Sequence, residues 1–327
     1  MKHSRRQFLH YAPIAAAVPI FMPKANADVY PSRAVRVIVP FAPGGQTDVV
    51  ARLVAQKLSE RLGKQFFIEN VAGAGSSIGV GRAAQATPDG YTVLFVDGVA
   101  FVTNPILQNN VPYQPITDFT PVTVAATTMQ VLAVHPSVPA NSVQELVALI
   151  KANPGKYSYA SAGTGTGSHL TGELFRSELH LDLVHVPYGG GGPAIGAALA
   201  GHTPISFGSA AATIPQHKEG KLRALAVGGK SRLRGLPDVP TLIETGYKNV
   251  ECDAVVGVLV PVKTPKEIIT ILHREIEAVV AMTEVQERFT ELGFETTRSS
   301  PDELSAFFQS DMLRWTDVIR TSGIKAK

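Results

Sequence analysis

Apolar residues recur along this chain in short runs that alternate with longer stretches of helical periodicity. Residues 35–39 form a mostly apolar, β-branched run, as in a buried strand, and the run stops at Pro40, which cannot donate to a strand ladder. From residue 46 apolar side chains return at helical spacing as far as Gly63, a residue typical of helix ends. The pattern therefore predicts a strand, a tight turn over residues 41–45, and a helix.

The same alternation continues through most of the sequence. We expect further strands at residues 65–69, 92–96, 129–135, 157–160, 183–186, 204–208, 224–228 and 254–260. We expect further helices at residues 76–85, 142–152, 194–200, 264–282, 284–292 and 302–320, with one more ending at 179 and a short one after 209. Residues 105–121 are rich in Asn, Pro and Gln and lack a period, so we expect a surface connection there. Strands that alternate with helices indicate parallel sheets with crossover connections.

Chain length and the place of the glycine-rich turns predict two lobes. About 300 residues exceed one typical hydrophobic core. We expect the chain to cross between the lobes at residues 129–135 and 254–260, so that 28–128 with 255–327 form one lobe and 129–254 the other. Ligands bind beyond the carboxyl ends of strands in open parallel sheets, where both halves carry glycine-rich turns. The predicted site is therefore the cleft between the lobes, which could close around a ligand.

The first 27 residues have the order of an export signal. Lys2, Arg5 and Arg6 precede an apolar stretch at residues 11–22, and small residues end the segment at Ala27. The run SRRQFL is typical of a twin-arginine signal. The apolar stretch contains two prolines and is too short to span about 30 Å of hydrocarbon. We expect cleavage after Ala27, export to a bacterial periplasm, and a soluble mature chain.

Removing this segment changes the charge balance. The full sequence carries 30 Lys and Arg against 27 Asp and Glu, and the signal segment takes four basic residues with it. The remaining balance of 26 to 27 gives no reason to expect nucleic-acid binding, and no basic run with interleaved aromatics is present. The single cysteine, Cys252, cannot form an intrachain disulfide, so we expect stability to come from the core.

The turn at residues 41–45 indicates an anion site. A strand that passes through glycines into a helix directs unpaired backbone N–H groups and the positive end of the helix dipole at whatever lies above the sheet. Thr47 or Asp48 could instead simply cap the helix. That alternative is local, and it does not explain why three further glycine-rich turns follow strands later in the chain.

Several segments together resemble one family. They are PFAPGGQTD, NVAGAGSSIGVGRAAQATPDGYTVLF, YASAGTGTGSH and HVPYGGGGPA, with LAVHP, GKLRALAV and PDVPTLIETG between or after them. They resemble segments of the tripartite tricarboxylate transporter receptors, the Bug/TctC-type periplasmic solute-binding proteins, and the resemblance covers essentially the whole mature chain. It implies a Venus flytrap of two α/β lobes, each a mostly parallel sheet flanked by helices, joined by two strand-like crossings. It also implies no cofactor and no catalysis.

The resemblance further implies that the protein binds a small organic carboxylate and delivers it to membrane permease subunits. We expect a monomer. Backbone groups, Thr47 and ordered water would hold the carboxylate, since a buried carboxylate needs many hydrogen-bond donors. The substrate-binding residues implied are Phe41, Ala42, Pro43, Gly44, Gly45, Thr47, Asp48, Val99, Phe101, Thr103, Ser161, Gly163, Thr164, Thr166, Ser168, His169, Tyr188, Gly189, Gly190 and Val255.

Two departures from the family pattern bear on the ligand. Relatives often carry a histidine shortly before Asn104, where this chain has Phe101, and aromatics where it has Val255 and Val256. These changes predict an apolar, roomier middle of the cleft. We therefore expect a dicarboxylate with a sizeable apolar body, aromatic or medium-chain, rather than citrate.

The sequence also contains a motif for a different function. Residues 75–79 match G-x-S-x-G, the nucleophile elbow of α/β-hydrolases, with Ser77 as the nucleophile. A chance match is easy in a chain with 29 glycines, and the preceding strand is interrupted. A hydrolase would lose turnover in Ser77→Ala, whereas a receptor has no turnover to lose.

Other candidate sites are weaker. The glycine-rich turn at residues 163–167 lacks the lysine of a P-loop. His180 and His185 flank a strand without metal-ligand spacing, and we expect no metal site. His169 is the histidine expected near the ligand, with the alternative that it is a residue of the first helical turn hydrogen-bonded to the backbone.

Overall fold

The computed structural model describes residues 30–108, 110–248, 250 and 253–325, so the predicted signal segment and Cys252 lie outside the described residues. The strands are β1 (Val35–Val39), β2 (Phe66–Asn70), β3 (Thr92–Asp97), β4 (Phe119–Val134), β5 (Ser158–Ser161), β6 (Val184–Pro187), β7 (Ile205–Ser209), β8 (Arg223–Val227), β9 (Asp253–Pro261) and β10 (Phe294–Glu295). The α-helices are α1 (Gln46–Leu62), α2 (Ser77–Ala84), α3 (Gly98–Leu107), α4 (Val143–Ala152), α5 (Gly167–Glu178), α6 (Gly191–Leu199), α7 (Ala210–Lys218), α8 (Lys266–Val280), α9 (Thr283–Glu291) and α10 (Pro301–Ser322), with a short 3-10 turn η1 (Ala74–Ser76).

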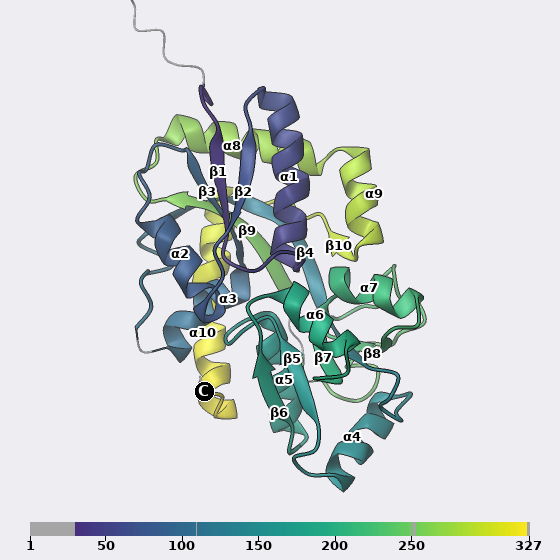
Figure 1. The fold of residues 1–327 in the computed structure, drawn as a ribbon. Coiled ribbons are helices and arrows are strands. Elements are labelled where there is room, and N and C mark those ends of the chain that lie inside the picture. The colour runs from purple at the N-terminus through teal and green to yellow at the C-terminus, as the bar shows by residue number, and fades with distance from the viewer. Residues whose placement is uncertain (1–29, 109, 249, 251–252, 326–327) are drawn as a thin grey trace, which may run out of the picture.

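The strands form two sheets that share β4. In the first sheet β2, β1 and β3 run parallel, and β9 lies antiparallel between β3 and the first part of β4. In the second sheet the last part of β4 pairs antiparallel with β7 and with β8, and β7, β5 and β6 are parallel. Figure 1 shows β4 passing from the upper lobe into the lower one. The sheets are therefore mixed, and not mostly parallel as expected from the sequence. The parallel pairs lie on the side of each sheet away from β4, and every described pair that involves β4 or β9 is antiparallel.

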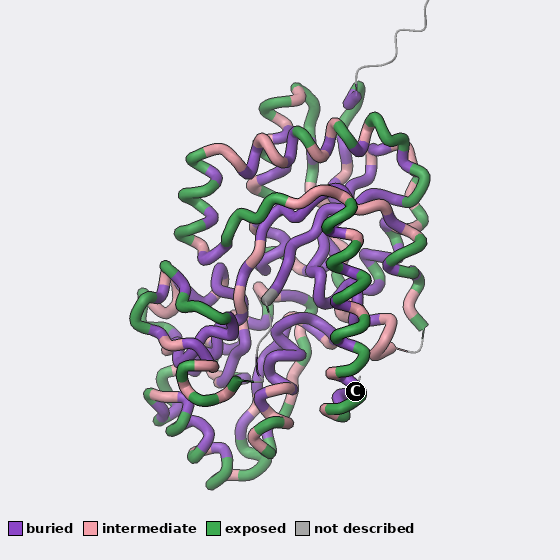
Figure 2. The backbone as a smooth tube through the Cα atoms, turned by 180° about the vertical axis from the view of Figure 1, so that it is seen from behind, coloured by how far each residue is buried: buried purple, intermediate pink, exposed green. Residues whose placement is uncertain are grey.

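Helices cover both faces of the first sheet. Residues of α1, α8 and α9 form one apolar cluster with β1, β3 and β9, whereas α2, α3 and α10 form another cluster with the opposite face. Burial follows this layering, since the strands in the interior of each lobe are buried and the outer faces of the helices are exposed (Figure 2). The C-terminal helices thus pack on the first lobe, as the absence of strands of their own suggested.

Two expectations about the connections need correction. We expected the chain to cross between lobes at residues 254–260, but β9 pairs with β3 and β4 of the first sheet along its described length. Its continuous apolar sequence reflects burial between two strands and not a crossing. The expected strand at residues 129–135 is the end of the longer β4, which does join the two sheets.

The segment at residues 105–121 is also more ordered than expected. Helix α3 runs to Leu107 with Pro105 inside it, and β4 starts at Phe119. A proline in a helix leaves the carbonyl four residues earlier without its usual donor. Here the hydroxyl of Tyr113 donates to the carbonyl of Phe101 at 3.0 Å and replaces that bond.

The α/β two-lobe fold predicted from the sequence is confirmed at the level of fold class by solved structures described below. The exact lobe bounds stay a prediction. Strand pairing supports them, because the first sheet takes its strands from residues 35–129 and 253–295 and the second from residues 130–227.

Candidate functional site

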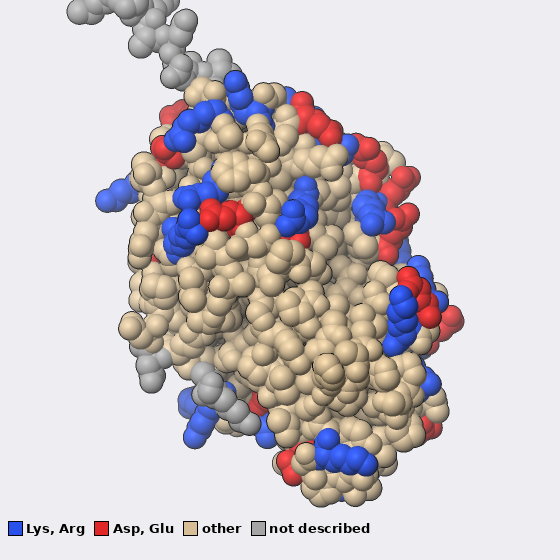
Figure 3. Space-filling view, viewed as in Figure 1, with Lys and Arg blue, Asp and Glu red and all other residues tan. Residues whose placement is uncertain are grey.

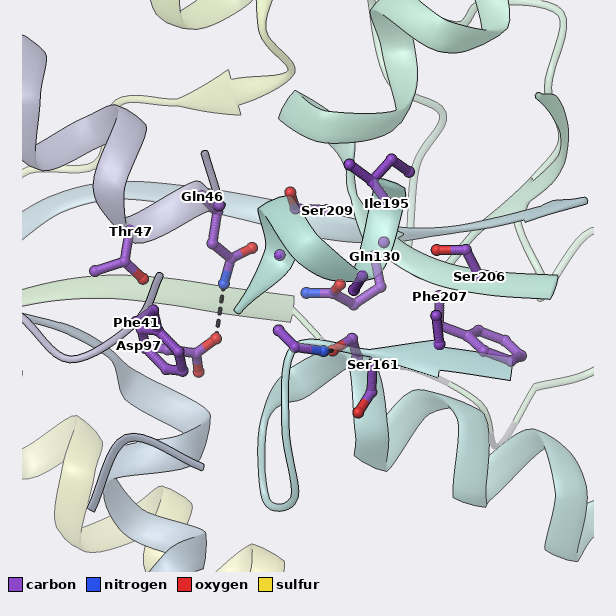
Figure 4. Close-up of a pocket in the computed structure, with 17 residues that line it drawn as sticks. Phe41, Gln46, Thr47, Asp97, Gln130, Ser161, Ile195, Ser206, Phe207 and Ser209 are labelled. Carbon is purple, nitrogen blue, oxygen red and sulfur yellow. Dashed lines mark hydrogen bonds between the residues drawn. The ribbon is translucent and has the colours of Figure 1, made fainter. Parts of the chain in front are cut away.

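A cavity lies between the two lobes, and we call it the interlobe cavity. It is lined by Phe41, Gly45, Gln46, Thr47, Asp97, Gln130, Ala160, Ser161, Ala162, Ser168, Gly191, Ala194, Ile195, Ser206, Phe207, Gly208 and Ser209. Figure 4 shows these residues reaching it from α1 and β3 on one side and from the strands and helices of the second lobe on the other. Its polar groups are hydroxyls, amides and one carboxyl, and none of the lining residues is Lys, Arg or His.

Three helices begin at this cavity without a side-chain cap. They are α1 after Gly45, α6 after Gly190 and α7 after Ser209, and none of these N-cap residues accepts a hydrogen bond through its side chain. The first backbone N–H groups of a helix have no partner inside the helix, and the helix dipole makes this end positive. Because the three ends come from both lobes, the cavity offers main-chain donors to an anion from two sides.

Asp48 builds the turn before α1 and does not line the cavity. Its carboxylate accepts hydrogen bonds from Gly44 N at 3.0 Å, Asn70 Nδ2 at 2.8 Å and Arg52 Nε at 2.9 Å. Burial opposes the charge, but these hydrogen bonds and the nearby Arg52 outweigh it and hold the pKa of Asp48 below its usual value. Asp48 is therefore a positioning residue for the turn at residues 41–45.

A second hydrogen-bond network shapes the turn before α5. Ser168 Oγ accepts from Ala162 N at 2.9 Å and shares a hydrogen bond with Thr166 Oγ1 at 3.0 Å. Thr166 donates to the carbonyl of Gly163 at 2.6 Å. His169 is buried, and its Nδ1 accepts from Gly165 N at 3.1 Å. These side chains fix the course of the turn, and Ser168 also lines the interlobe cavity. His169 makes a backbone contact, and its expected place near the ligand stays a prediction.

The glycine-rich turns of the two lobes touch each other. Ala42 N donates to the carbonyl of Gly189 at 2.9 Å. A Cβ added to Gly45 would lie 3.1 Å from Gly191 N, and one added to Gly190 would lie 2.9 Å from Ala42 N. Contacts this short leave no room for a side chain, so glycine at these positions lets the lobes meet in the closed form described here.

The remaining predicted residues fall into three groups. Ala42, Pro43, Gly44 and Thr103 belong to the contact between lobes, and Thr103 donates to the carbonyl of Gly165 at 2.7 Å. A second, open hollow next to the cavity, the outer hollow, is lined by Phe41, Gly73, Ala74, Gly75, Ser76, Gln108, Ala162, Gly163, Thr164, Pro187, Tyr188 and Gly189. Val99, Phe101 and Val255 are buried in the core of the first lobe.

Phe101 and Val255 therefore do not line the interlobe cavity, contrary to the expectation. Phe101 packs with Tyr113, Phe119 and Phe308 at ring-centre distances of 5.0 to 5.7 Å. Burial in this aromatic cluster satisfies an apolar ring better than a polar cleft does. We leave Val99, Phe101 and Val255 out of the candidate site.

The sequence analysis missed Gln46, Asp97, Gln130, Ser206 and Ser209 as cavity residues. Asp97 ends a strand whose residues are all buried, and Gln130 is a polar residue inside an apolar run. A polar side chain at the carboxyl end of a buried strand is the signal that could have identified Asp97, since ligands bind at that edge of the sheet.

Four buried side-chain atoms in and beside the cavity have no hydrogen-bond partner. They are Gln46 Oε1, Ser206 Oγ, Ser209 Oγ and Thr213 Oγ1. Buried polar atoms are nearly always paired in folded proteins, so such a group of unpaired atoms indicates that a polar ligand or water belongs there.

Of the residues that line the interlobe cavity, Asp97 alone has an ionisable side chain. On the face seen in Figure 3, Lys, Arg, Asp and Glu lie over the upper lobe and along the right and lower edges, and the band between the lobes shows none. In the described part of the chain, no three His, Cys, Asp or Glu side chains gather in a way that could hold a metal ion. Nor does the described part include a helix both long and apolar enough to cross a membrane.

Comparison with known proteins identifies the family. Residues 50–324 match the family described as tripartite tricarboxylate transporter family receptor. The chain is 34% identical over 321 residues to the protein BugT of Bordetella pertussis, covering 98% of this chain and 96% of that protein.

Solved structures are similar over the same length. The R. palustris protein Rpa4515 with adipate has a TM-score of 0.88 and 32% identity, covering 90% of this chain and 99% of that one. MatC from Rhodopseudomonas palustris with bound malate has a TM-score of 0.84 and 31% identity, covering 89% and 100%. The resemblance stated from the sequence is confirmed, and the chain belongs to the tripartite tricarboxylate transporter receptor family.

Proposed function

We propose that this protein is a periplasmic receptor that binds a small organic carboxylate in the interlobe cavity and delivers it to a tripartite permease. The observation that carries the proposal is the meeting of three helix N-termini without side-chain caps, from both lobes, at one cavity that no Lys or Arg lines. Backbone N–H groups hold an anion without a permanent counter-charge, which favours release to a membrane partner.

The ligand class proposed is a dicarboxylate. Rpa4515 and MatC are described with adipate and malate, both dicarboxylates, and this supports the class. The sizeable apolar body expected from the sequence rested on Phe101, Val255 and Val256. These side chains pack in the core, so that part of the expectation loses its support.

We propose that the protein is not an enzyme. Ser77 is buried, and its hydroxyl lies 3.4 Å from Gln108 Oε1, an amide that cannot act as a general base. Ser77 also follows a 3-10 turn and not a strand, unlike the serine of a nucleophile elbow. The hydrolase alternative thus lacks the local geometry that its motif requires.

Export by the twin-arginine route and a monomeric receptor in the periplasm complete the proposal. The sequence SRRQFL near the N-terminus supports the route. Replacing Arg5 and Arg6 by lysine should leave uncleaved precursor in the cytoplasm, as measured by fractionation and immunoblotting. Normal periplasmic accumulation of that variant would exclude the twin-arginine route.

A melting-temperature screen of the mature protein against mono-, di- and tricarboxylates tests the central proposal. Ligand at about 100 times its dissociation constant should stabilise the folded state by about 2.7 kcal/mol. Mass spectrometry after incubation should recover the ligand unchanged. The receptor function fails if no carboxylate raises the melting temperature, or if the bound compound is chemically converted.

A further inference from the structure

A buried carboxyl group lies in a cavity that otherwise suits an anion. Asp97 ends β3, is 4% exposed, and lines the interlobe cavity together with the start of α1. No Lys, Arg or His lines the cavity beside it. A carboxylate taken out of water without a cationic partner is costly. We therefore expect the ligand that enters the cavity to neutralise the charge of the Asp97 carboxylate.

The protein satisfies only part of what this group requires. Asp97 Oδ1 accepts from Ala100 N at 3.0 Å, which caps α3, and the other oxygen accepts from Gln46 Nε2 at 2.7 Å. Because the Gln46 amide turns its nitrogen to Asp97, its Oε1 faces the cavity without a donor, although Gln46 is only 9% exposed. Figure 4 shows this amide between α1 and Asp97 with its oxygen turned away from the carboxylate.

Turning the amide over does not remove the problem. The Gln46 oxygen would then face an ionised Asp97, and two acceptors cannot bond each other. As long as Asp97 is ionised, the favoured orientation leaves the Gln46 amide oxygen unpaired at the end of the cavity that the Asp97 carboxylate also lines. Both groups accept hydrogen bonds and neither donates toward the ligand.

We propose that Asp97 and Gln46 Oε1 form a subsite for an ammonium group, so that the ligand is a zwitterion of the amino-acid class. This inference rests on the proposed function, because the carboxylate of the same ligand still binds the helix N-termini. An ammonium group supplies three donors and one positive charge. It neutralises the charge of the Asp97 carboxylate, and it donates a hydrogen bond to the unpaired Gln46 Oε1.

The charge balance favours this ligand over an unsubstituted dicarboxylate. A second carboxylate placed at Asp97 would meet a like charge at close range unless one of the two groups were protonated. Burial raises the pKa of Asp97 to about 6, and the carboxylate of Asp311 on α10 also raises it, whereas bonds from Ala100, Val99 and Gln46 lower it. Asp311 is itself paired with Arg314 at 3.1 Å, so Arg314 does not compensate Asp97 directly.

Matched ligand pairs test the subsite. Calorimetric titration at pH 7.5 compares succinate with aspartate, glutarate with glutamate, and adipate with 2-aminoadipate. The wild-type protein should bind the better amino ligand at least tenfold more tightly than its unsubstituted partner. Asp97→Asn should remove that preference, whereas Asp317→Asn, the same change at an exposed position of α10, should keep it.

Three other results would reject the ammonium subsite, and a fourth would reject the receptor function as well. Equal binding of each pair to the wild type, or a preference that survives in Asp97→Asn, overturns the subsite while leaving a carboxylate receptor intact. Equal binding of malate and aspartate also overturns it, because a neutral hydroxyl would then suffice. If no carboxylate of either series binds, the proposed function fails and the subsite with it.

A pH series on the wild-type protein keeps the test independent of whether Asp97→Asn folds. Affinity for the amino ligand should fall as pH drops from 7.5 to 5, because protonation of Asp97 removes the charge that the ammonium group needs. A ligand whose second carboxylate faced Asp97 would show the opposite trend. A rise in amino-ligand affinity over this range would overturn the proposal.

Discussion

Two buried carboxyl groups of the first lobe have different tasks. Asp48 accepts three hydrogen bonds and holds the turn at residues 41–45 in place. Asp97 accepts hydrogen bonds from Ala100 and Gln46 and lines the cavity. The pKa of Asp48 is lowered and that of Asp97 is raised. The contribution of Asp48 to the unfolding free energy is therefore lost as pH falls, and that of Asp97 is lost as pH rises.

Replacing Asp48 by alanine should weaken both the fold and ligand binding. The substitution leaves the Asn70 amide and Gly44 N–H without their acceptor, which costs about 2–3 kcal/mol of unfolding free energy. Urea denaturation measures this loss, and ligand-induced thermal stabilisation should disappear because the turn is no longer fixed. Arg52→Ala, which removes the half-exposed partner, should cost less than about 1 kcal/mol. Full ligand binding by Asp48→Ala would contradict the positioning role.

Because of Asp97, the unliganded protein should have a higher unfolding free energy at mildly acidic pH than at neutral pH. Burial raises its folded pKa to about 6 from an ordinary 3.8, so the folded protein holds a proton that the unfolded chain releases between these values. The unfolding free energy should therefore fall as pH rises through this window. Asp97→Asn, which keeps a side chain able to cap α3, should be about 3 kcal/mol more stable than the wild type at pH 7.5. The difference should fall to about 1 kcal/mol at pH 4.5, and urea denaturation at both values measures it.

For single residues, the sequence predicts which groups can donate hydrogen bonds more reliably than it predicts whether a side chain faces the cavity or the core. The donors at residues 41–47 follow from local chain direction, because a strand, a glycine turn and a helix place N–H groups at one sheet edge. Phe101 and Val255 could not be assigned in this way. Whether a buried apolar side chain faces a cleft or a core depends on the helix packed against it, here α10, which is about 200 residues away in the sequence for Phe101.

At the scale of elements, the glycines between α1 and α6 determine whether the lobes can meet. Gly45 is the N-cap residue of α1 with φ near −86°, so its backbone conformation is open to other residues. The need for glycine arises from contact, since a Cβ would lie 3.1 Å from Gly191 N and 3.3 Å from Gly191 Cα of the other lobe. Backbone atoms on a packed turn cannot move aside as a flexible side chain can.

Gly45→Val should abolish ligand-induced thermal stabilisation while the unliganded protein remains folded. The valine side chain would hold the turns of the two lobes apart, so a ligand would reach donors from only one lobe. Gly196→Val is the matched control, because Gly196 is exposed on α6 and a Cβ there meets nothing within 4 Å. Circular dichroism checks the fold and a thermal shift with ligand checks binding. Undiminished stabilisation of Gly45→Val would show that closure does not need this contact.

Element prediction from the sequence succeeded where periodicity was local and failed where distant residues complete a bond. Strand β7 and helices α8 and α10 lie within a few residues of their predicted positions. Helix α3 was missed because Pro105 lies inside it, and the compensating donor is the hydroxyl of Tyr113 eight residues further along the chain. The first part of β4 was missed for a related reason, since its pairing with β9 joins segments more than 120 residues apart.

At the scale of the whole molecule, the structure is a closed form. Ala42 bonds Gly189 across the lobes, Thr103 bonds Gly165, and the polar atoms of Gln46 and Ser206 that face the cavity are shut off from solvent. A ligand cannot reach such atoms while these contacts hold. Entry and release therefore require the lobes to separate, and the shared strand β4 is one of the connections about which they would do so.

Small-angle X-ray scattering should detect this motion. Without ligand the radius of gyration should exceed that of the closed form, because opening exposes the unpaired polar atoms of the cavity to water. Saturating ligand should lower the radius of gyration to that of the closed form, since a bound carboxylate pairs donors from both lobes simultaneously. Gly45→Val should keep the larger value with or without ligand, and Gly196→Val should behave as the wild type. The scattering of the wild type could instead be the same with and without a ligand that calorimetry shows to be bound. The lobes would then not move as rigid bodies. Entry would have to occur through local rearrangement beside Phe41, which lies between the interlobe cavity and the outer hollow.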